Sequence, residues 1–173
     1  MRRENPAAKH DARLRDVRAF LFDVDGVLTV GGVSFTSQSF ETKTFHVADA
    51  HGLRLAVDFG IRVGFITGSQ SHIIEQRARE LGITDLYQGS LNKLDAYEDF
   101  RALYDLRDEE IAYMGDSMLD VPVLRRVGFS CAPRNAHSGV RIAVHYVTRA
   151  DGGAGAVREV VDMLLRANGQ SAA

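Results

Sequence analysis

Short apolar runs alternate along this chain with longer segments of helical periodicity. The apolar residues of 72–82 share one face before Gly82, and those of 92–106 repeat at helical spacing. The apolar runs predict strands at 19–24, 61–67, 84–89, 110–116, 128–132 and 145–148. Strands that alternate with helices in this way predict an α/β fold, a doubly wound and mostly parallel sheet with helices on both faces.

One segment, 30–47, breaks this alternation. It opens with a Gly-Gly turn signal, and the apolar residues that follow alternate with polar ones, which predicts a β-hairpin inserted after the first strand. Phenylalanines exposed on one face of such a hairpin favour pairing with another subunit. The rest of the pattern predicts a single domain over 18–168, with a flexible basic leader at 1–17 and a loose tail at 169–173.

The charges of the chain nearly cancel, since 21 lysines and arginines face 23 aspartates and glutamates among 173 residues. No overall field therefore attracts nucleic acid or an anionic membrane, and a charged ligand must meet a local site. The apolar runs are too short for a secretory signal or a transmembrane span. The single cysteine, Cys131, cannot form an internal disulfide, which is typical of a reducing compartment and predicts a cytoplasmic protein.

Reactive side chains stand where the predicted strands end. Ligands bind at this edge of open α/β sheets, so these residues are expected to converge on one crevice. They are Asp23 and Asp25 after the first strand, Thr67 and Gly68 after the second, Lys93 after the third, and Asp116 and Asp120 after the fourth. The first two aspartates point to the same side of an extended strand, and the last two are one turn apart on an expected helix.

Each of these signals also has a structural interpretation when it is taken by itself. Paired aspartates occur in turns, and an aspartate such as Asp116 near a helix start often caps that helix. Lys93 follows Asn92, a plausible N-cap, and is typical of a solvated surface lysine. The pair Thr67-Gly68 suits a helix cap as well as an anion site formed by free backbone N–H groups.

The combination favours phosphoryl transfer over these separate interpretations. Several carboxylates at one mouth repel one another unless a cation lies between them, and oxygen ligands favour Mg²⁺. A metal ion and the Lys93 ammonium would neutralise a phosphate, and a hydroxyl would position it. One carboxylate would then attack phosphorus, and a second would manage the proton of the leaving group.

Four segments in order, DVDGVLT, ITGS, Lys93 and GDSMLD, resemble the motifs of the haloacid dehalogenase superfamily of phosphatases. Intervals of 44, 26 and 23 residues separate Asp23, Thr67, Lys93 and Asp116, too few for a full cap domain, so the chain resembles capless members. More narrowly, 19–165 resembles the 3-deoxy-D-manno-octulosonate 8-phosphate phosphatases through FHVADAHGLRLA, GITDLYQGSLNKL, YMGDSMLDVPVL and GGAGAVREVVDMLL. This resemblance implies a place in lipopolysaccharide biosynthesis.

The resemblance implies a role for the residues that act on the phosphate. Asp23 would be the nucleophile that forms an aspartyl-phosphate. Asp25 would be the acid that protonates the leaving alcohol and then activates water. Thr67, Gly68 and Lys93 would hold the phosphoryl oxygens.

The cofactor implied by the resemblance is Mg²⁺. Its ligands would be Asp23, the main-chain carbonyl of Asp25 and Asp116, while Asp120 would support Lys93 or the metal shell. Members of the family are homotetramers in which the inserted hairpins assemble. Neighbouring subunits complete the active sites in place of the missing cap.

The departures from the family pattern concern the substrate. Ser69 stands where an arginine is usual after the ITG motif, and Ala48 stands where the arginine of an RDG segment is usual. Two missing guanidinium groups remove bidentate partners for a sugar carboxylate. Lys43, His46 and His51 are candidates to restore part of that positive charge. The expected substrate is 3-deoxy-D-manno-octulosonate 8-phosphate, with a nonulosonate 9-phosphate of the sialic acid or deaminated sialic acid type as the alternative.

Two other classes of protein share parts of this pattern. A receiver domain also uses Asp, Thr, Lys and Mg²⁺ on an α/β sheet, but its order differs from the order Asp, Thr, Lys, Asp found here. A noncatalytic assembly module, of the kind attached to cytidylyltransferases, is a further alternative, and the four intact motifs argue against it. The glycines of 151–160 lack the pattern of a nucleotide loop and suit a helix start or a flexible tail.

Overall fold

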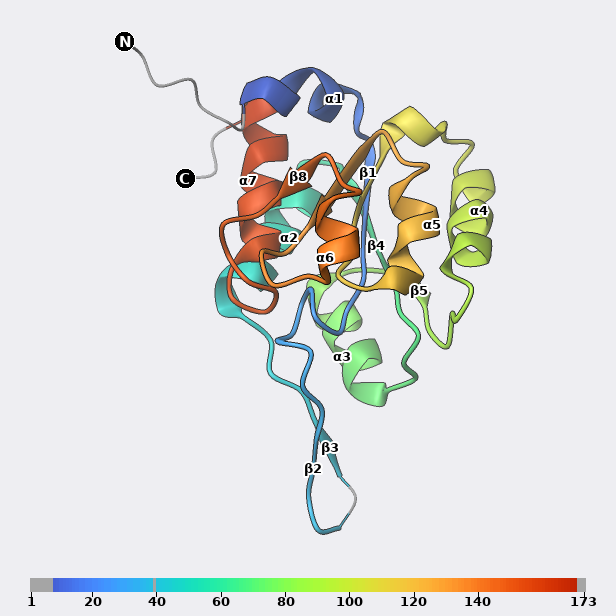
Figure 1. The fold of residues 1–173 in the computed structure, drawn as a ribbon, viewed down its shortest axis with the longest axis vertical. Coiled ribbons are helices and arrows are strands. Elements are labelled where there is room, and N and C mark those ends of the chain that lie inside the picture. Colours follow the sequence, from blue (N-terminus) through green and yellow to red (C-terminus); the bar gives the residue numbers. More distant parts are fainter. Residues whose placement is uncertain (1–7, 39, 171–173) are drawn as a thin grey trace.

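A six-stranded sheet lies at the centre of the computed structural model, which describes residues 8–38 and 40–170 (Figure 1). The strands are β1 (Ala19–Phe22), β4 (Arg62–Ile66), β5 (Asp85–Tyr87), β6 (Ile111–Met114), β7 (Phe129–Ala132) and β8 (Tyr146–Val147). Their order is β5-β4-β1-β6-β7-β8, and every neighbouring pair is parallel. Each strand lies inside an apolar run of the sequence, so the predicted parallel sheet is confirmed. All six carboxyl ends therefore point to the same edge.

Helices cover both faces of the sheet, as predicted for a doubly wound fold. One face holds α1 (Asp11–Asp16), α2 (Val47–Asp58), α3 (His72–Leu81) and α7 (Ala156–Ala167), and the other holds α4 (Lys93–Leu103), α5 (Val121–Leu124) and α6 (Ser138–Arg141). Successive β1 side chains point to opposite faces, so Phe20 and Phe22 pack with the first group and Ala19 and Leu21 with the second. Full burial of each phenylalanine stabilises the fold by about 2–3 kcal/mol.

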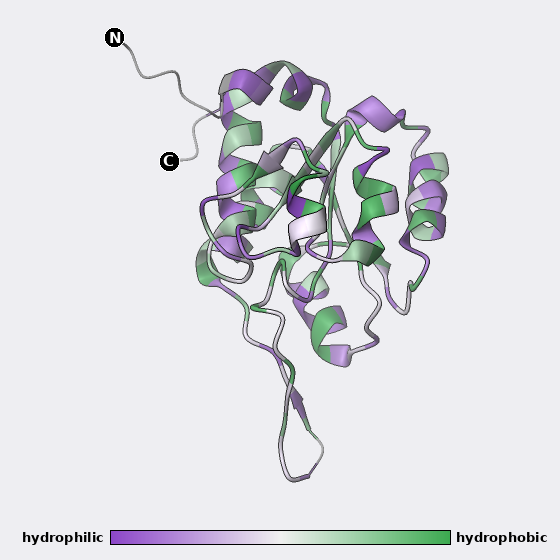
Figure 2. Ribbon diagram, viewed as in Figure 1, coloured by the Kyte–Doolittle hydropathy of each residue, from purple (hydrophilic) through white to green (hydrophobic). Residues whose placement is uncertain are grey.

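Hydrophobic and hydrophilic residues alternate along α4 and α7 in Figure 2, as expected of amphipathic helices that cover a sheet. Three short 3₁₀ helices accompany them: η1 (Ala8–His10), η2 (Asp108–Glu110) and η3 (Met118–Asp120). Within the described part of the chain, every helix is too short or too polar to span a bilayer.

Caps define the ends of two helices that flank the carboxyl edge of the sheet. At the start of α3, Ser71 Oγ accepts a hydrogen bond from a main-chain N–H at 3.2 Å, and Gly82 ends the helix with a left-handed φ of 73°, as predicted. At α7 the cap comes from another helix, because buried Asp49 of α2 accepts from the N–H groups of Gly155 and Arg158 at 3.2 and 2.8 Å. The glycine-rich segment before α7 is thus a helix start, fastened to α2.

The prediction of a flexible leader at 1–17 is wrong for the second half of that segment. There α1 packs against α7, and Leu14 and Val17 are buried in the core. These two residues lie three positions apart among charged neighbours, an amphipathic signal too short to stand out in the sequence. Residues 1–7 and 171–173, which belong to the expected leader and tail, lie outside the described residues.

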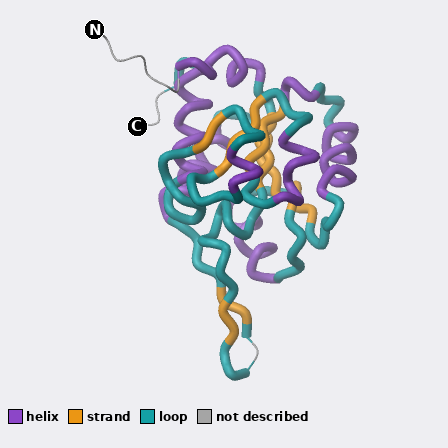
Figure 3. Tube along the Cα trace, in the orientation of Figure 1, coloured by secondary structure: helices purple, strands orange, loops and turns teal. Residues whose placement is uncertain are grey.

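The predicted hairpin is present, but its paired strands are shorter than the segment 30–47. β2 (Ser34–Phe35) pairs antiparallel with β3 (Glu41–Thr42), and most of the insertion is loop (Figure 3). The hairpin extends beyond the carboxyl edge of the sheet (Figure 1), and Phe35 and Phe40 are 69% and 63% exposed. Within 8–38 and 40–170, the connections between sheet strands hold this hairpin and helices, and no cap domain.

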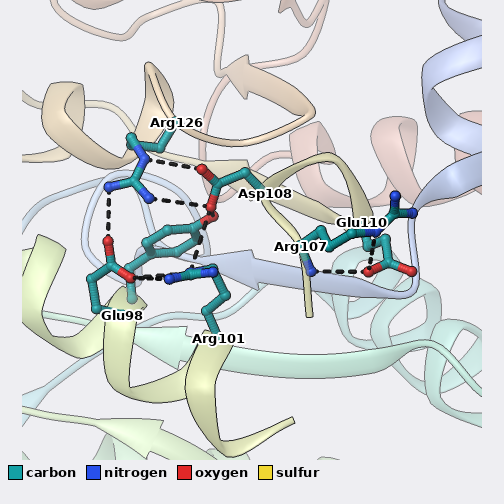
Figure 4. A network of polar contacts seen from close by, with 7 residues as sticks. Glu98, Arg101, Arg107, Asp108, Glu110 and Arg126 are labelled. Atoms are coloured by element: carbon teal, nitrogen blue, oxygen red, sulfur yellow. Dashed lines mark hydrogen bonds and ion pairs between the residues drawn. The ribbon is translucent and has the colours of Figure 1, made fainter. Parts of the chain in front are cut away.

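A network of charged side chains lies at the amino end of β6 (Figure 4). Arg126 donates to Glu98 at 2.7 Å and to Asp108 at 3.0 Å, while Arg101 donates to Glu98 at 2.8 Å. The hydroxyl of Tyr97 donates to Asp108 at 2.6 Å. This network joins α4 to the segments before β6 and after α5. It lies at the amino ends of the strands, whereas the predicted site residues follow the carboxyl ends.

Candidate active site

Asp23 is the first residue beyond β1 and is held rigidly. Its N–H donates to the carbonyl of Met114 at 2.9 Å, which continues the strand pairing by one residue. Its Oδ1 accepts from the N–H of Val24 at 2.7 Å, and its Oδ2 lies 2.8 Å from Lys93 Nζ. Only 5% of Asp23 is exposed. The β1 strand therefore presents a fixed carboxylate at the carboxyl edge of the sheet.

Lys93, the first residue of α4, lies between two aspartates. Its Nζ is 2.8 Å from Asp23 Oδ2 and 2.7 Å from Asp120 Oδ1, and the side chain is almost completely buried. Burial by itself would lower the pKa of Lys93, but the charges of Asp23 and Asp120 outweigh burial and raise this pKa. The two carboxylates therefore favour the charged form of Lys93. Asn92 occupies the predicted N-cap position of α4, but its side chain makes no capping hydrogen bond.

Asp120 uses both carboxylate oxygens to order its surroundings. Oδ1 accepts from Lys93 and from the Tyr113 hydroxyl, at 2.7 and 2.6 Å. Oδ2 accepts from the N–H groups of Asp116 and Ser117, at 3.1 and 3.0 Å, and from the Ser117 hydroxyl at 3.1 Å. The expected helix that carries both aspartates is wrong, because Asp116 lies in the loop after β6 and Asp120 ends η3. The loop nevertheless brings both to the same mouth.

Asp116 has an oxygen without a partner. Its Oδ1 is buried and forms no hydrogen bond with the described groups. Carboxylate oxygens of Asp23, Asp116 and Asp120 lie within 4.8 Å of one another. Burial, and then the charge of Asp120, raise the pKa values of Asp23 and Asp116. The oxygens of Asp120 already accept five hydrogen bonds. The oxygens that fit a hard divalent cation therefore belong to Asp23 and Asp116.

Two glycines allow the acidic residues to approach so closely. A Cβ atom on Gly26 would lie 2.0 Å from Asp116 Oδ2, and Gly26 has a φ of +88°. A Cβ atom on Gly115 would lie 2.4 Å from Asp120 Cγ. The glycines of DVDG and GD are therefore part of the site geometry, because no other residue leaves room for these carboxylates.

Asp25 faces away from this cluster, toward the hairpin. Its Oδ1 accepts from Lys43 Nζ at 2.6 Å, and its Oδ2 accepts from the Ser69 hydroxyl at 2.7 Å. About a quarter of its side chain is exposed, so Asp25 lies at the mouth of the site. Two aspartates only two residues apart thus occupy different environments, one buried beside Lys93 and one at the surface.

Thr67 and Gly68 follow β4, the strand next to β1. Thr67 is buried, its N–H donates to the carbonyl of Tyr87 at 2.9 Å, and its Oγ1 accepts from the N–H of Ser69 at 3.1 Å. The structure thus joins Asp23, Lys93 and the two aspartates after β6 in one cluster. It places Thr67 and Gly68 on the adjacent strand end, linked to Asp25 through Ser69.

A family model of haloacid dehalogenase-like hydrolases matches residues 66–160 of the chain. The 3-deoxy-D-manno-octulosonate 8-phosphate phosphatase of Yersinia pestis is 43% identical over 155 residues, which cover 90% of this chain and 83% of the relative. The chain belongs to the haloacid dehalogenase-like hydrolases.

Solved structures of other haloacid dehalogenase-like hydrolases have the same fold. The crystal structure of the Yersinia pestis phosphatase matches with a TM-score of 0.91 and 42% identity, over 92% of this chain and 86% of that one. The 3-deoxy-D-manno-octulosonate 8-phosphate phosphatase of Moraxella catarrhalis, in complex with a magnesium ion, a phosphate ion and KDO, matches with a TM-score of 0.90 and 34% identity, over 92% and 91%. The predicted family and fold are therefore confirmed.

Two features of this haloacid dehalogenase-like hydrolase were not among the predicted site contacts. Tyr113 binds Asp120 from within β6, and a tyrosine in a fully buried strand is a weak signal that its hydroxyl needs a partner. Lys43 is not a free cation that replaces a missing arginine, because Asp25 and Glu41 already pair with it. The side chain of His46 is 42% exposed, with Nδ1 3.9 Å from an Asp49 oxygen.

Proposed function

We propose that this chain is a Mg²⁺-dependent phosphatase that hydrolyses the phosphate monoester of a sugar acid through an aspartyl-phosphate. The observation that carries the proposal is the buried Asp23 at the end of β1, paired with Lys93 beside the unpartnered oxygen of Asp116. The Asp23 carboxylate is buried beside one fixed cation and beside a carboxylate oxygen that has no hydrogen-bond partner among the described residues. This arrangement suits attack on a phosphate dianion. The similarity to octulosonate phosphatases supports the same reaction.

In the first step, an Asp23 oxygen forms a bond to phosphorus while the bond from phosphorus to the ester oxygen breaks. Asp25 donates its proton to that leaving oxygen, which departs as an alcohol. Lys93 neutralises charge on the phosphoryl oxygens, and the Thr67 hydroxyl with the Gly68 N–H orients them. In the second step, Asp25 takes a proton from water, the water oxygen bonds to phosphorus, and the Asp23 carboxylate leaves as phosphate departs.

Mg²⁺ fits the acidic cluster beside Asp23. Asp23, Asp116 and the main-chain carbonyl of Asp25 would hold the ion, and Asp120 would support Lys93. Bound there, the ion would supply positive charge against the phosphoryl oxygens. The raised pKa values of Asp23 and Asp116 support this assignment, because a cation relieves the repulsion between them.

The proposed substrate is 3-deoxy-D-manno-octulosonate 8-phosphate, the substrate in the names of relatives that are 43% identical. Its hydrolysis would release a free sugar acid, in keeping with lipopolysaccharide biosynthesis. A nonulosonate 9-phosphate is the second candidate. It is favoured by Ser69 and Ala48 in place of the expected arginines, and by Lys43, whose charge is already balanced.

We further propose a homotetramer in the cytoplasm. The exposed Phe35 and Phe40 of the hairpin offer an apolar surface for neighbouring subunits, which would complete the site in place of a cap. The unpaired, buried Cys131 suits a reducing compartment. Sedimentation of the full chain tests the assembly, and a fully active monomer would refute it.

The decisive experiment compares initial rates of phosphate release from the octulosonate 8-phosphate and from nonulosonate 9-phosphates, with and without Mg²⁺. We expect Mg²⁺-dependent turnover and a clear preference for the octulosonate. Asp23→Asn is the control, and it should be inactive on every ester. Failure of the wild-type chain to release phosphate from any ester would favour the noncatalytic assembly module.

A further inference from the structure

The carboxylate of Asp25 is held at both oxygens by residues to which the predicted mechanism gives no role. Lys43 Nζ lies 2.6 Å from Oδ1, and the Ser69 hydroxyl donates to Oδ2 at 2.7 Å. An aspartate at the mouth of a site otherwise has rotational freedom about both side-chain bonds. With two short, charge-assisted contacts, one on each oxygen, its orientation is fixed.

The hairpin supplies Lys43, and a chain of polar contacts holds it there. Lys43 Nζ lies 3.2 Å from Glu41 Oε1, and the other oxygen of Glu41 accepts from the Ser71 hydroxyl at 2.6 Å. Ser71 also caps α3. The side chain of Lys43 has no exposed surface, so this lysine bridges the hairpin and the mouth of the site.

The charge of Lys43 is fully used by its two neighbours. Burial by itself would lower the pKa of Lys43, but hydrogen bonds from Lys43 to Asp25 and Glu41 outweigh burial and raise this pKa. One ammonium faces two carboxylates, so no net positive charge remains for a substrate carboxylate. The geometry instead fits a lysine that acts on Asp25.

Ser69 suits an aspartate that must change its protonation state. A neutral hydroxyl donates to a carboxyl oxygen without adding positive charge, whereas an arginine brings a cation that favours the ionised form. In the proposed reaction, Asp25 loses a proton to the leaving oxygen and regains one from water. The Ser69 hydroxyl can donate to Oδ2 in both states when the proton is carried on Oδ1, which has a second lone pair beside its contact with Lys43.

We propose that Lys43 and Ser69 are positioning residues that aim the Asp25 carboxylate for proton transfer, and that the hairpin delivers Lys43 through Glu41. This inference rests on the proposed phosphatase function. Proton transfer requires a donor within hydrogen-bond reach of the leaving oxygen, so a displaced Asp25 slows those steps in which the leaving group needs a proton. The bond between Asp23 and phosphorus does not depend on Asp25 in this way.

The test uses the full chain with Mg²⁺ and phosphate monoesters whose leaving groups differ in acidity. kcat/KM reports the steps up to formation of the aspartyl-phosphate, so it isolates protonation of the leaving oxygen. For Lys43→Met we expect kcat/KM to fall about 100-fold on an alkyl phosphate such as the sugar acid ester. On 4-nitrophenyl phosphate it should fall less than about threefold, because an acidic phenol leaves without a proton. For Ser69→Ala, kcat/KM should also fall more on the alkyl phosphate than on 4-nitrophenyl phosphate, but both losses should be smaller than for Lys43→Met.

Two further variants separate positioning from folding. Lys43→Arg keeps the cation and should restore most of the activity on the alkyl ester. Thr42→Val alters the hairpin next to Lys43 without touching Asp25, since the Thr42 hydroxyl donates to the carbonyl of Ser34, and it should leave both rates unchanged.

Equal losses on both esters in Lys43→Met and Ser69→Ala would overturn the inference, and so would unchanged rates. Should Lys43→Met fail to fold, as judged by circular dichroism, Ser69→Ala decides the question. A wild-type chain that hydrolyses neither ester would instead overturn the proposed function itself, so the two failures are distinguishable.

Discussion

The two ends of β6 carry clusters of charged side chains that differ in how their charges are balanced. At the amino end, Arg101 and Arg126 pair with Glu98 and Asp108 near the surface (Figure 4). At the carboxyl end, Lys93 pairs with the buried Asp23 and Asp120, and the partly buried Asp116 completes the cluster of aspartates.

Opposite pKa shifts follow from this difference. Hydrogen bonds from Arg101 and Arg126 lower the pKa of Glu98, and although partial burial opposes it, the contacts of Tyr97 and Arg126 lower the pKa of Asp108. At the carboxyl end, burial raises the pKa values of Asp23 and Asp116. The same residue types therefore stabilise the fold at one end of a strand, and at the other end leave negative charge that a cation can bind.

The largest contrast is expected in catalysis. Asp23→Asn removes the proposed nucleophile and should lower kcat/KM at least about 10⁴-fold. Asp108→Asn, at the other end of β6, should leave kcat/KM within about twofold of the wild type. Initial rates of phosphate release check both. An Asp23→Asn enzyme within about tenfold of the wild-type rate would contradict the assigned mechanism.

A second contrast concerns the two kinds of cation. Lys93→Met leaves buried carboxylates without a counter-charge and should lower the free energy of unfolding by about 3–5 kcal/mol. Arg126→Met removes a partly exposed cation and should cost less than about 1 kcal/mol. Urea denaturation without Mg²⁺ measures both. If the two substitutions lowered the free energy of unfolding equally, burial would not explain a difference between the clusters at the two ends of β6.

Metal binding should sharpen the difference further. Mg²⁺ at 100 times its Kd should stabilise the wild-type chain by about 2.7 kcal/mol. Asp116→Asn should bind Mg²⁺ at least about tenfold more weakly, and without metal it should be slightly more stable than wild type, because one repelling charge is lost. Thermal unfolding during a Mg²⁺ titration measures both effects, with Asp108→Asn as the matched control. An unchanged Mg²⁺ response in Asp116→Asn would refute its role as a ligand.

The smallest effect is a pH dependence at the amino end. Because the folded pKa of Asp108 lies below its ordinary value of 3.8, its ionised form stabilises the folded state above that pH, and the stabilisation is lost as pH falls through the folded value. The free energy of unfolding of the wild type should therefore exceed that of Asp108→Asn by about 1 kcal/mol at pH about 7. This difference should be smaller at pH about 3.5. Urea denaturation at both pH values measures this difference. If the difference is the same at both, the effect of the substitution comes from packing and not from the charge of Asp108.

The sheet and most of the cluster could be predicted because both follow from local pattern. Apolar runs mark the strands, and parallel strands bring their carboxyl ends together, so Asp23, Lys93 and Asp116 were expected to meet. The α1 helix escaped prediction because its packing on α7 depends on Leu14 and Val17, two apolar residues in a charged segment.

The surroundings of Asp25 could not be predicted, for a different physical reason. Lys43 lies 18 residues further along the chain, on an insertion whose path is set by contacts such as that between Glu41 and Ser71. Ser69 is identifiable as a departure from the family pattern, but its hydrogen bond to Asp25 depends on how the loop after β4 folds. Tertiary contacts of this kind leave no periodic signal in a single sequence.

The contact between α1 and the end of α7 has a practical consequence. Arg15 Nε donates to the carbonyl of Ala167 at 3.2 Å, and Asn168 Nδ2 donates to the carbonyl of Leu14 at 3.3 Å, at the end of the molecule opposite the hairpin (Figure 1). Engineered cysteines on the outer surface of α1 would tether the protein to a solid support with its catalytic edge turned toward the liquid. Immobilised in this orientation, the protein could be supplied with esters and ions by flow.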